Sequence, residues 1–457
     1  MPRTRRMPTA TDTTMKVDIG SSTDVPETTD TAPTALPADS AAVRHGATLW
    51  GNAPYLLLMT GKTGQLVGAG VAAFAVPLVA FAVTGSVFLA GVITAVAEVG
   101  VLVVTLPAGM IADRVDRRRL IIVCSAIGIA LWASLAITDA AGALGGWQLA
   151  ATLAAASAVA AFYGPAETAS IRFVVRPEQL GSAMAAMQGR SAAASLAAAP
   201  LGGLLYGLSR ALPFVAGILG YLVAGITALA VRAPLNDPPS SEQASGAGSI
   251  AEGIRFVLGV PFLRLGVVVF AAINLAFDGV VVGVNLHLVA AHTAPLAIAM
   301  VDVAVGITMI AGSVLAPTLV KRFPTGWLAV ACLIPSGLGA VGMAVTDDYA
   351  GYIVWSCVMT AFIPTVNAGL LGYAAAITPL SLQARMSSVV MISSLAVAPI
   401  APVIAGWALP TLGVPFTLGA FGALLLASTV ALGVARSVRR IGRPGTWESD
   451  ALTAAAG

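Results

Sequence analysis

The fold of this chain is decided by residues 86–119, which read SVFLAGVITAVAEVGVLVVTLPAGMIADRVDRRR. From Ser86 to Ile111 the stretch is apolar or small except for two threonines and one charge, Glu98. An apolar run of about 20 residues is long enough to cross a bilayer as a helix. Four arginines follow shortly afterwards, and Lys and Arg gather at the cytoplasmic ends of membrane helices. The stretch therefore predicts a membrane helix that ends at the cytoplasm.

The composition of the whole chain extends this prediction. The 457 residues are 58% hydrophobic and 10% charged, whereas soluble domains average about 45 to 50% and about 25%. Apolar runs of membrane-spanning length recur from Tyr55 to Arg436. They lack the alternating pattern of barrel strands, so helices are the expected spanning elements. The sequence predicts an all-α membrane protein with the lipid bilayer as its partner, and it gives no sign of nucleic-acid binding.

Turn signals and charge clusters divide the apolar region into twelve transmembrane helices. The expected spans are 54–83, 86–111, 118–138, 147–170, 181–208 and 213–232 in the first half, and 261–289, 295–320, 326–346, 350–377, 386–408 and 412–435 in the second. The expected domains are a disordered cytoplasmic tail at 1–48, a six-helix half at 54–232, a cytoplasmic linker at 233–258, a second six-helix half at 261–436 and a cytoplasmic tail at 437–457. The first tail is too rich in Thr, Asp, Pro and Ser to bury a core, and it lacks the pattern of a secretory signal.

The basic residues show which side of the membrane each loop faces. Of the 24 lysines and arginines, all but Lys62, Arg190 and Arg210 fall at helix ends or tails on one side. By the positive-inside rule that side is the cytoplasm. Both termini are then cytoplasmic, which requires an even number of spans. We expect a multi-pass protein of the bacterial inner (cytoplasmic) membrane that acts as a monomer.

The two halves resemble each other at an offset of 202 residues. This offset pairs Pro177 with Pro379, Met184 with Met386, and Ala199-Pro200 with Ala401-Pro402. Each half therefore has a proline before its fifth helix and an Ala-Pro pair within it. Two six-helix halves related by parallel repetition place a substrate site between them, near the middle of the membrane.

The loop between the second and third spans carries the most specific motif, GMIADRVDRRR at residues 109–119. A carboxylate among arginines can form charge-assisted hydrogen bonds that differ between two conformations. The motif resembles the G-x-x-x-D-R-x-x-R-R signature of the major facilitator superfamily and is complete from Gly109 to Arg118. Other segments resemble the branch of bacterial siderophore exporters and multidrug efflux proteins, namely Thr84-Gly85-Ser86, Phe162-Tyr163-Gly164-Pro165-Ala166, residues 175–180 (VRPEQL) and Ala384-Arg385-Met386.

The resemblance implies an alternating-access transporter with the major facilitator fold. It assigns a conformational latch on the cytoplasmic side to Gly109, Asp113, Arg114, Arg117 and Arg118. The second-half counterpart, near residues 312–322, keeps Lys321 and Arg322 but has no Asp, so the latch is expected to be asymmetric. Antiporters of the superfamily often carry G-P-x-x-G-G in the fifth helix. This chain has a shorter version, with Ala199 in place of the first glycine, followed by Pro200, Gly202 and Gly203.

Ionisable residues within the spans are the candidates for proton coupling and substrate binding, because a charge in the membrane is costly and is retained for function. They are Glu98, Lys62, Arg190, Asp278 and Asp302. Glu98 is the first choice for the proton, since burial favours a protonated carboxyl group and a nearby cation favours the ionised one. The alternative is a permanent ion pair of Glu98 with Lys62 or Arg190 that only holds helices together.

Other functional classes are not indicated. Gly61-Lys62-Thr63 looks like the end of a phosphate loop, but Leu56 stands where the motif needs glycine. The cysteines Cys124, Cys332 and Cys357 lie in apolar runs without the spacing of metal ligands. We therefore expect no enzymatic activity, no cofactor, no metal and no ATP-driven pumping.

The sequence as a whole favours a secondary active transporter. The leading interpretation is proton-coupled efflux of a hydrophobic or amphiphilic small molecule, such as a drug, a natural product or a siderophore, with protons and that molecule as its partners. The alternative is an importer or facilitator of a small metabolite, which the altered fifth-helix motif favours.

Overall fold

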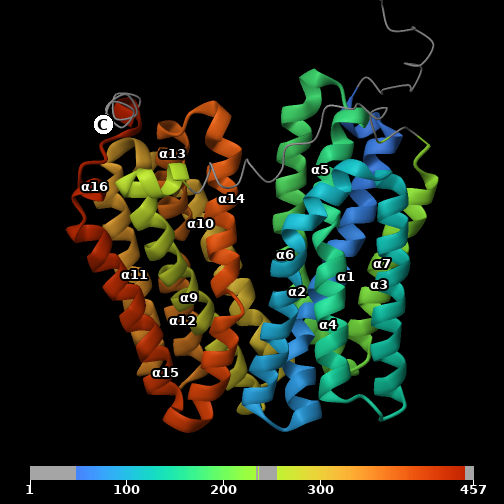
Figure 1. Cartoon of the computed structure of the whole chain (residues 1–457). Coiled ribbons are helices and arrows are strands. Elements are labelled where there is room, and N and C mark those ends of the chain that lie inside the picture. Colours follow the sequence, from blue (N-terminus) through green and yellow to red (C-terminus); the bar gives the residue numbers. More distant parts are fainter. Residues whose placement is uncertain (1–47, 233–234, 236–254, 448–457) are drawn as a thin grey trace, which may run out of the picture. The chain divides into compact units, whose positions relative to one another are not determined.

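The computed structural model describes residues 48–232, 235 and 255–447 (Figure 1). The predicted tail at 1–48, apart from residue 48, and most of the predicted linker at 233–258 lie outside the described residues. Among the described residues helices connected by short loops are the only regular secondary structure, and there is no strand.

The first six spans form seven helices, which run from blue to green in Figure 1: α1 (Ala53–Thr84), α2 (Val87–Arg114), α3 (Arg117–Ala140), α4 (Gly146–Ala161), α5 (Tyr163–Val174), α6 (Leu180–Leu208) and α7 (Leu212–Ala230). The second set, from yellow to red, comprises α9 (Pro261–Ala290), α10 (Pro295–Arg322), α11 (Thr325–Ala344), α12 (Tyr349–Thr360), α13 (Ile363–Ile377), α14 (Leu380–Val397), α15 (Ile400–Val434) and the short α16 (Arg436–Arg439).

The fourth and tenth spans are each broken into two helices. The fourth is Gly146–Val174 and breaks at Phe162, and the tenth is Tyr349–Ile377 and breaks at residues 361–362. A proline lies in the first turn after each break, Pro165 in α5 and Pro364 in α13. Proline has no N–H to donate and is accommodated in the first turn, where that donor has no helical partner anyway. The breaks therefore follow from the local sequence.

No loop separates the last two spans, because α15 (Ile400–Val434) runs from one into the other with a kink at Gly413. Eleven helical stretches of the described chain are long and apolar enough to cross a membrane, and the last of them covers 50 residues, Arg385–Val434. At 1.5 Å per residue it would be about 75 Å long, more than twice the roughly 30 Å of a hydrocarbon core. Gly413 interrupts it with φ 82° and ψ 168°, a conformation that suits glycine. Divided at Gly413, the stretch supplies two spans, and the prediction of a twelve-helix all-α membrane fold is confirmed.

Helix ends coincide with capping residues that the sequence provides. Asn52, Ser86 and Asp116 accept hydrogen bonds from the backbone N–H groups of Tyr55, Leu89 and Arg119, at 3.2, 3.3 and 2.9 Å. Such caps satisfy N–H groups that the first helical turn leaves unpaired. At the other end of α1, Gly85 takes the left-handed conformation that commonly ends a helix, with φ 64°.

The two sets of helices contact each other most extensively through two equivalent helix pairs, α2 with α15 and α6 with α10. A Cβ atom at Gly91 of α2 would lie 2.3 Å from the Pro402 oxygen of α15, and one at Gly203 of α6 would lie 2.7 Å from the Pro295 oxygen of α10. Only glycine allows this approach. In each pair the fifth span of one half meets the second span of the other, as expected for the repeat found in the sequence.

The end of the described chain packs on the second set of helices. The backbone N–H groups of Thr325 and Gly326 donate to the carbonyl oxygens of Gly442 and Ile441, at 3.0 and 3.3 Å. Ile441 and Val438 are buried. The stretch 437–457, predicted as a tail, is therefore part of the folded unit over its described portion.

Candidate functional site

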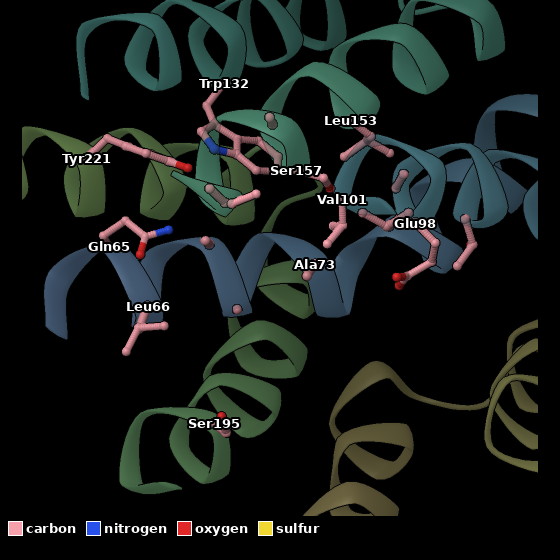
Figure 2. A pocket seen from close by; sticks show the side chains of 18 of the residues that line it. Gln65, Leu66, Ala73, Glu98, Val101, Trp132, Leu153, Ser157, Ser195 and Tyr221 are labelled. Atoms are coloured by element: carbon pink, nitrogen blue, oxygen red, sulfur yellow. The ribbon is translucent and has the colours of Figure 1, made fainter. Parts of the chain in front are cut away.

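A cavity of about 530 Å³ lies among α1, α2, α3, α4, α6 and α7. Its volume is in the range of small-molecule binding sites. Most of its wall is apolar, and Figure 2 shows Leu66, Ala73, Val101, Trp132 and Leu153 around it. Each of the six helices contributes at least one lining residue, and α1 contributes the most. The cavity is large enough to hold a drug-sized ligand.

Three polar side chains gather at one end of the cavity. They are Lys62 and Gln65 of α1 and Tyr221 of α7. The Lys62 ammonium donates a hydrogen bond to Gln65 Oε1 at 2.8 Å, and the Gln65 side chain is hydrogen-bonded to Tyr221. Gln65 and Tyr221 are buried, with 2% and 1% of their surface exposed. The arrangement holds the ammonium group at the cavity wall.

An aromatic ring supports Lys62 from a second direction. The ammonium nitrogen lies 5.0 Å from the centroid of the Tyr163 ring on α5, within the range of a cation–π interaction. The Tyr163 hydroxyl is hydrogen-bonded to Ser125 and donates to the Ile121 carbonyl oxygen at 3.2 Å. Tyr163 is thereby held against α3, and its ring is a fixed surface for the cation.

Glu98 of α2 lies at the opposite end of the cavity from Gln65 and Tyr221 (Figure 2). It makes no salt bridge with any residue that the structure describes. Asp278 of α9, in the other half, lies within electrostatic range of the Glu98 charge. Two of the predicted ionisable candidates, one from each half, therefore approach each other.

Arg190 forms an ion pair with Glu167 and not with Glu98, the partner that the sequence suggested. On α6, its guanidinium binds both carboxylate oxygens of Glu167 on α5, with Nη2 donating to Oε2 at 3.1 Å and Nη1 donating to Oε1. The two side chains are 9% and 6% exposed. Lys62 donates its hydrogen bond to Gln65. In this structure neither Lys62 nor Arg190 therefore forms an ion pair with Glu98.

Asp302 of α10 lies apart from this site. It lines a small cavity of about 40 Å³ together with Asn285 of α9 and Ser356 of α12. Such a volume holds about one water molecule or ion rather than an organic substrate. The Asn285 Oδ1 atom is buried there and has no hydrogen-bond partner among the described atoms.

The motif between α2 and α3 holds the end of α7. Arg118 donates to the carbonyl oxygens of Ala228 and Leu229 at 3.0 and 2.6 Å, and Arg117 donates to that of Leu235 at 2.7 Å. Gly109 has open space where a Cβ would be. The side chains of Asp113 and Arg114 lie outside the described residues. The latch assigned to these five residues stays a prediction.

The fifth-helix motif is a packing element in this structure. Pro200 lies inside α6. A Cβ at Gly202 would lie 2.8 Å from the Phe74 side chain of α1, whereas Gly203 faces α10 as described above. The motif thus lets α6 pack against a helix of its own half and one of the other half.

Sequence reasoning missed Glu167, Gln65, Tyr163 and Tyr221. Glu167 carried a usable signal, because it is an ionisable residue within the predicted span 147–170. The other three are uncharged, and polar residues of that kind occur in many membrane helices. Within the described residues no group of three or more His, Cys, Asp or Glu side chains could hold a metal ion.

Comparison with known proteins identifies the family. A sequence model of the Major Facilitator Superfamily matches residues 58–293, which is more than half of the chain. No curated protein sequence matches.

Solved structures that match the fold include several with low sequence identity. A bacterial homologue of the human lysosomal transporter Spinster, inward-facing and unoccupied, is 16% identical with a TM-score of 0.61 over 88% of this chain and 97% of that one. A bacterial homologue of the iron transporter ferroportin, inward-facing, is 16% identical with a TM-score of 0.65 over 85% and 99%. The nucleoside transporter NupG is 10% identical with a TM-score of 0.65 over 83% and 99%. The chain therefore belongs to the Major Facilitator Superfamily and is a multi-pass membrane transport protein rather than an enzyme.

Proposed function

We propose that the protein is a proton-coupled secondary transporter that exports an amphiphilic small molecule across the bacterial inner membrane by alternating access. The observation that carries this proposal is the cavity of about 530 Å³, whose walls are mainly apolar and whose two charged side chains, Lys62 and Glu98, stand toward opposite ends. Apolar walls bind the body of a ligand, and a few placed polar groups orient it. A hydrophobic or amphiphilic substrate fits such a surface better than a sugar or another highly hydroxylated solute.

Glu98 supports proton coupling. It faces the cavity without an ion pair among the described residues, and a carboxyl group in apolar surroundings favours its protonated form. Asp278 adds a second negative charge from the other half. Movement of α2 relative to α9 changes the repulsion between the two carboxylates, so proton uptake and release can accompany the change of access.

Export is the proposed direction because several segments resemble those of bacterial siderophore exporters and multidrug efflux proteins. Import or facilitated movement of a small metabolite is the second candidate. The replacement of the antiporter motif's first glycine by Ala199 favours it. Import would be supported if substrate uptake required an inward proton gradient and deletion of the gene caused no loss of resistance or secretion.

The test is transport into inverted membrane vesicles with a panel of amphiphilic compounds, with and without a proton gradient. In Glu98→Gln we expect gradient-driven accumulation to fall about a hundredfold, the usual scale for losing an essential proton-transfer group. Exchange of substrate at equal concentrations on both sides should persist, since it needs no net proton movement. The matched control is Glu178→Gln, which changes an exposed carboxylate between α5 and α6. Unchanged gradient-driven transport by Glu98→Gln would contradict the proposal.

A further inference from the structure

We propose that the substrate carries one negative charge, an organic carboxylate, and that Lys62 binds it. This inference rests on the proposed function, because it takes the large cavity as the transport site. The polar end of that cavity, formed by Lys62, Gln65 and Tyr221, receives the anionic group, and the apolar wall receives the body of the molecule.

The charges at this end do not balance. Lys62, Arg190 and Glu167 are close enough to interact electrostatically, which gives two cations and one carboxylate. The Glu167 carboxylate is paired with Arg190, from which it accepts two hydrogen bonds. Lys62 makes no salt bridge with a described residue, and its only hydrogen bond given by the structure goes to a neutral amide. One positive charge is therefore left without a counter-ion.

A surplus charge in such surroundings has an energetic consequence. Removing a cation from water is costly, and the cost is recovered only when an opposite charge or sufficient dipoles surround it. An ammonium group has three donors. Gln65 accepts one of them, and the Tyr163 ring provides further stabilisation through its face. An incoming carboxylate supplies two acceptors and the missing charge at once.

The geometry of the cavity defines the rest of the ligand. Beyond Lys62 the wall is formed by apolar side chains such as Leu66, Trp132 and Leu153, and the next charge is Glu98 at the far end (Figure 2). Lys62 is the only cation among the residues that line the cavity, so a second anionic group at the far end would find no positive charge there. The structure thus favours an amphiphilic monoanion with an apolar body over a neutral compound, a cation or a dianion.

The experiment uses three probes with one body and different charges: 6-phenylhexanoate, its primary amide and 6-phenylhexylamine. Equilibrium binding is measured to the purified full chain in lipid nanodiscs. We expect the carboxylate to bind at least about tenfold more tightly than the amide or the amine, the scale of one charge-assisted hydrogen bond. Lys62→Met should remove this preference, whereas Lys62→Arg should keep it.

The matched control is Lys321→Met, which removes an exposed lysine at the end of α10 and should leave the preference unchanged. Equal binding of carboxylate and amide by the unmodified protein would overturn the inference, as would a preference that survives in Lys62→Met. The comparison of probes on the unmodified protein decides the question even if Lys62→Met does not fold.

Transport of the same probes separates this inference from the proposed function. Proton-driven transport that favours the amide or the amine would refute the anionic substrate and leave the transporter function intact. Selective carboxylate binding without proton-driven transport of any substrate would refute the coupling and leave the anion site intact.

Discussion

At the scale of single residues, the Arg190–Glu167 pair is the strongest electrostatic feature beside the cavity. Both side chains are nearly buried, and the guanidinium contacts both carboxylate oxygens. Breaking a buried pair on one side is far more costly than replacing both partners, because the remaining charge loses its counter-ion. Because Glu167 is paired with Arg190, Lys62 has no carboxylate partner among the described residues, which is the basis of the proposed anion site.

Glu167→Gln is expected to destabilise the protein by about 3 to 5 kcal/mol, because it leaves Arg190 charged and buried. The double variant Glu167→Gln, Arg190→Met should recover most of that loss, since it removes both charges. Thermal unfolding in nanodiscs of the unmodified protein, the two single variants and the double variant measures the coupling energy between Glu167 and Arg190. Equal stability of Glu167→Gln and the unmodified protein would show that the ion pair is not important for folding.

At the scale of elements, the motif at residues 109–119 joins the start of α3 to the end of α7. Asp116 caps α3, and Arg118 binds two of the last carbonyl groups of α7. The last carbonyls of a helix lack partners within the helix and carry its negative dipole end, so a guanidinium suits them. The described contacts of Asp116 and Arg118 therefore lie within one half of the molecule.

Arg118→Met is expected to loosen the last turn of α7. Hydrogen bonds to charged groups contribute about 1.5 to 3 kcal/mol each, so amide exchange near residues 227–231 should become at least about tenfold faster. The measurement is hydrogen–deuterium exchange with mass spectrometry. Arg119→Met is the matched control, because Arg119 is the exposed neighbour of Arg118. If the amides near residues 227–231 exchange at the same rate in both variants, the contact from Arg118 does not stabilise α7.

At the scale of the whole folded unit, the contacts between α2 and α15 and between α6 and α10 are those that alternating access has to change. Their closeness depends on glycine, as at Gly203 beside Pro295 and at Gly91 beside Pro402. Tightly packed interfaces have discrete arrangements rather than a continuous range. A larger side chain at one of them should therefore shift the balance between conformations.

Gly203→Leu is expected to separate the ends of α6 and α10, because a Cβ there would lie 2.7 Å from the Pro295 oxygen and overpacking costs about 1 to 3 kcal/mol. Spin labels are attached to Leu208→Cys and Leu296→Cys, and they report the distance between these two positions. The native cysteines Cys124, Cys332 and Cys357 are replaced by serine. The distribution should move to longer distances and transport should fall. Gly207→Leu is the control, since nothing lies within 4 Å of a Cβ at that position. An unchanged distribution would show that the contact does not govern the conformation.

The number and order of spans were predictable from the sequence because each span is an apolar run and each run must cross the same thickness of hydrocarbon. The helix breaks in the fourth and tenth spans also have local causes, in Pro165 and Pro364. The ionisable residues of the spans could be identified one by one, since a charge is conspicuous among apolar neighbours. The sequence by itself thus determined the class, the elements and most of the ionisable candidates.

Only the tertiary structure decided which of these residues meet. It brings Lys62 to Gln65, Arg190 to Glu167, and Glu98 within range of Asp278. Those partners lie on different helices or depend on how each helix is rotated about its axis. In lipid that rotation is set by close packing of small residues rather than by a hydrophobic face, so no amphipathic pattern in the sequence reports it.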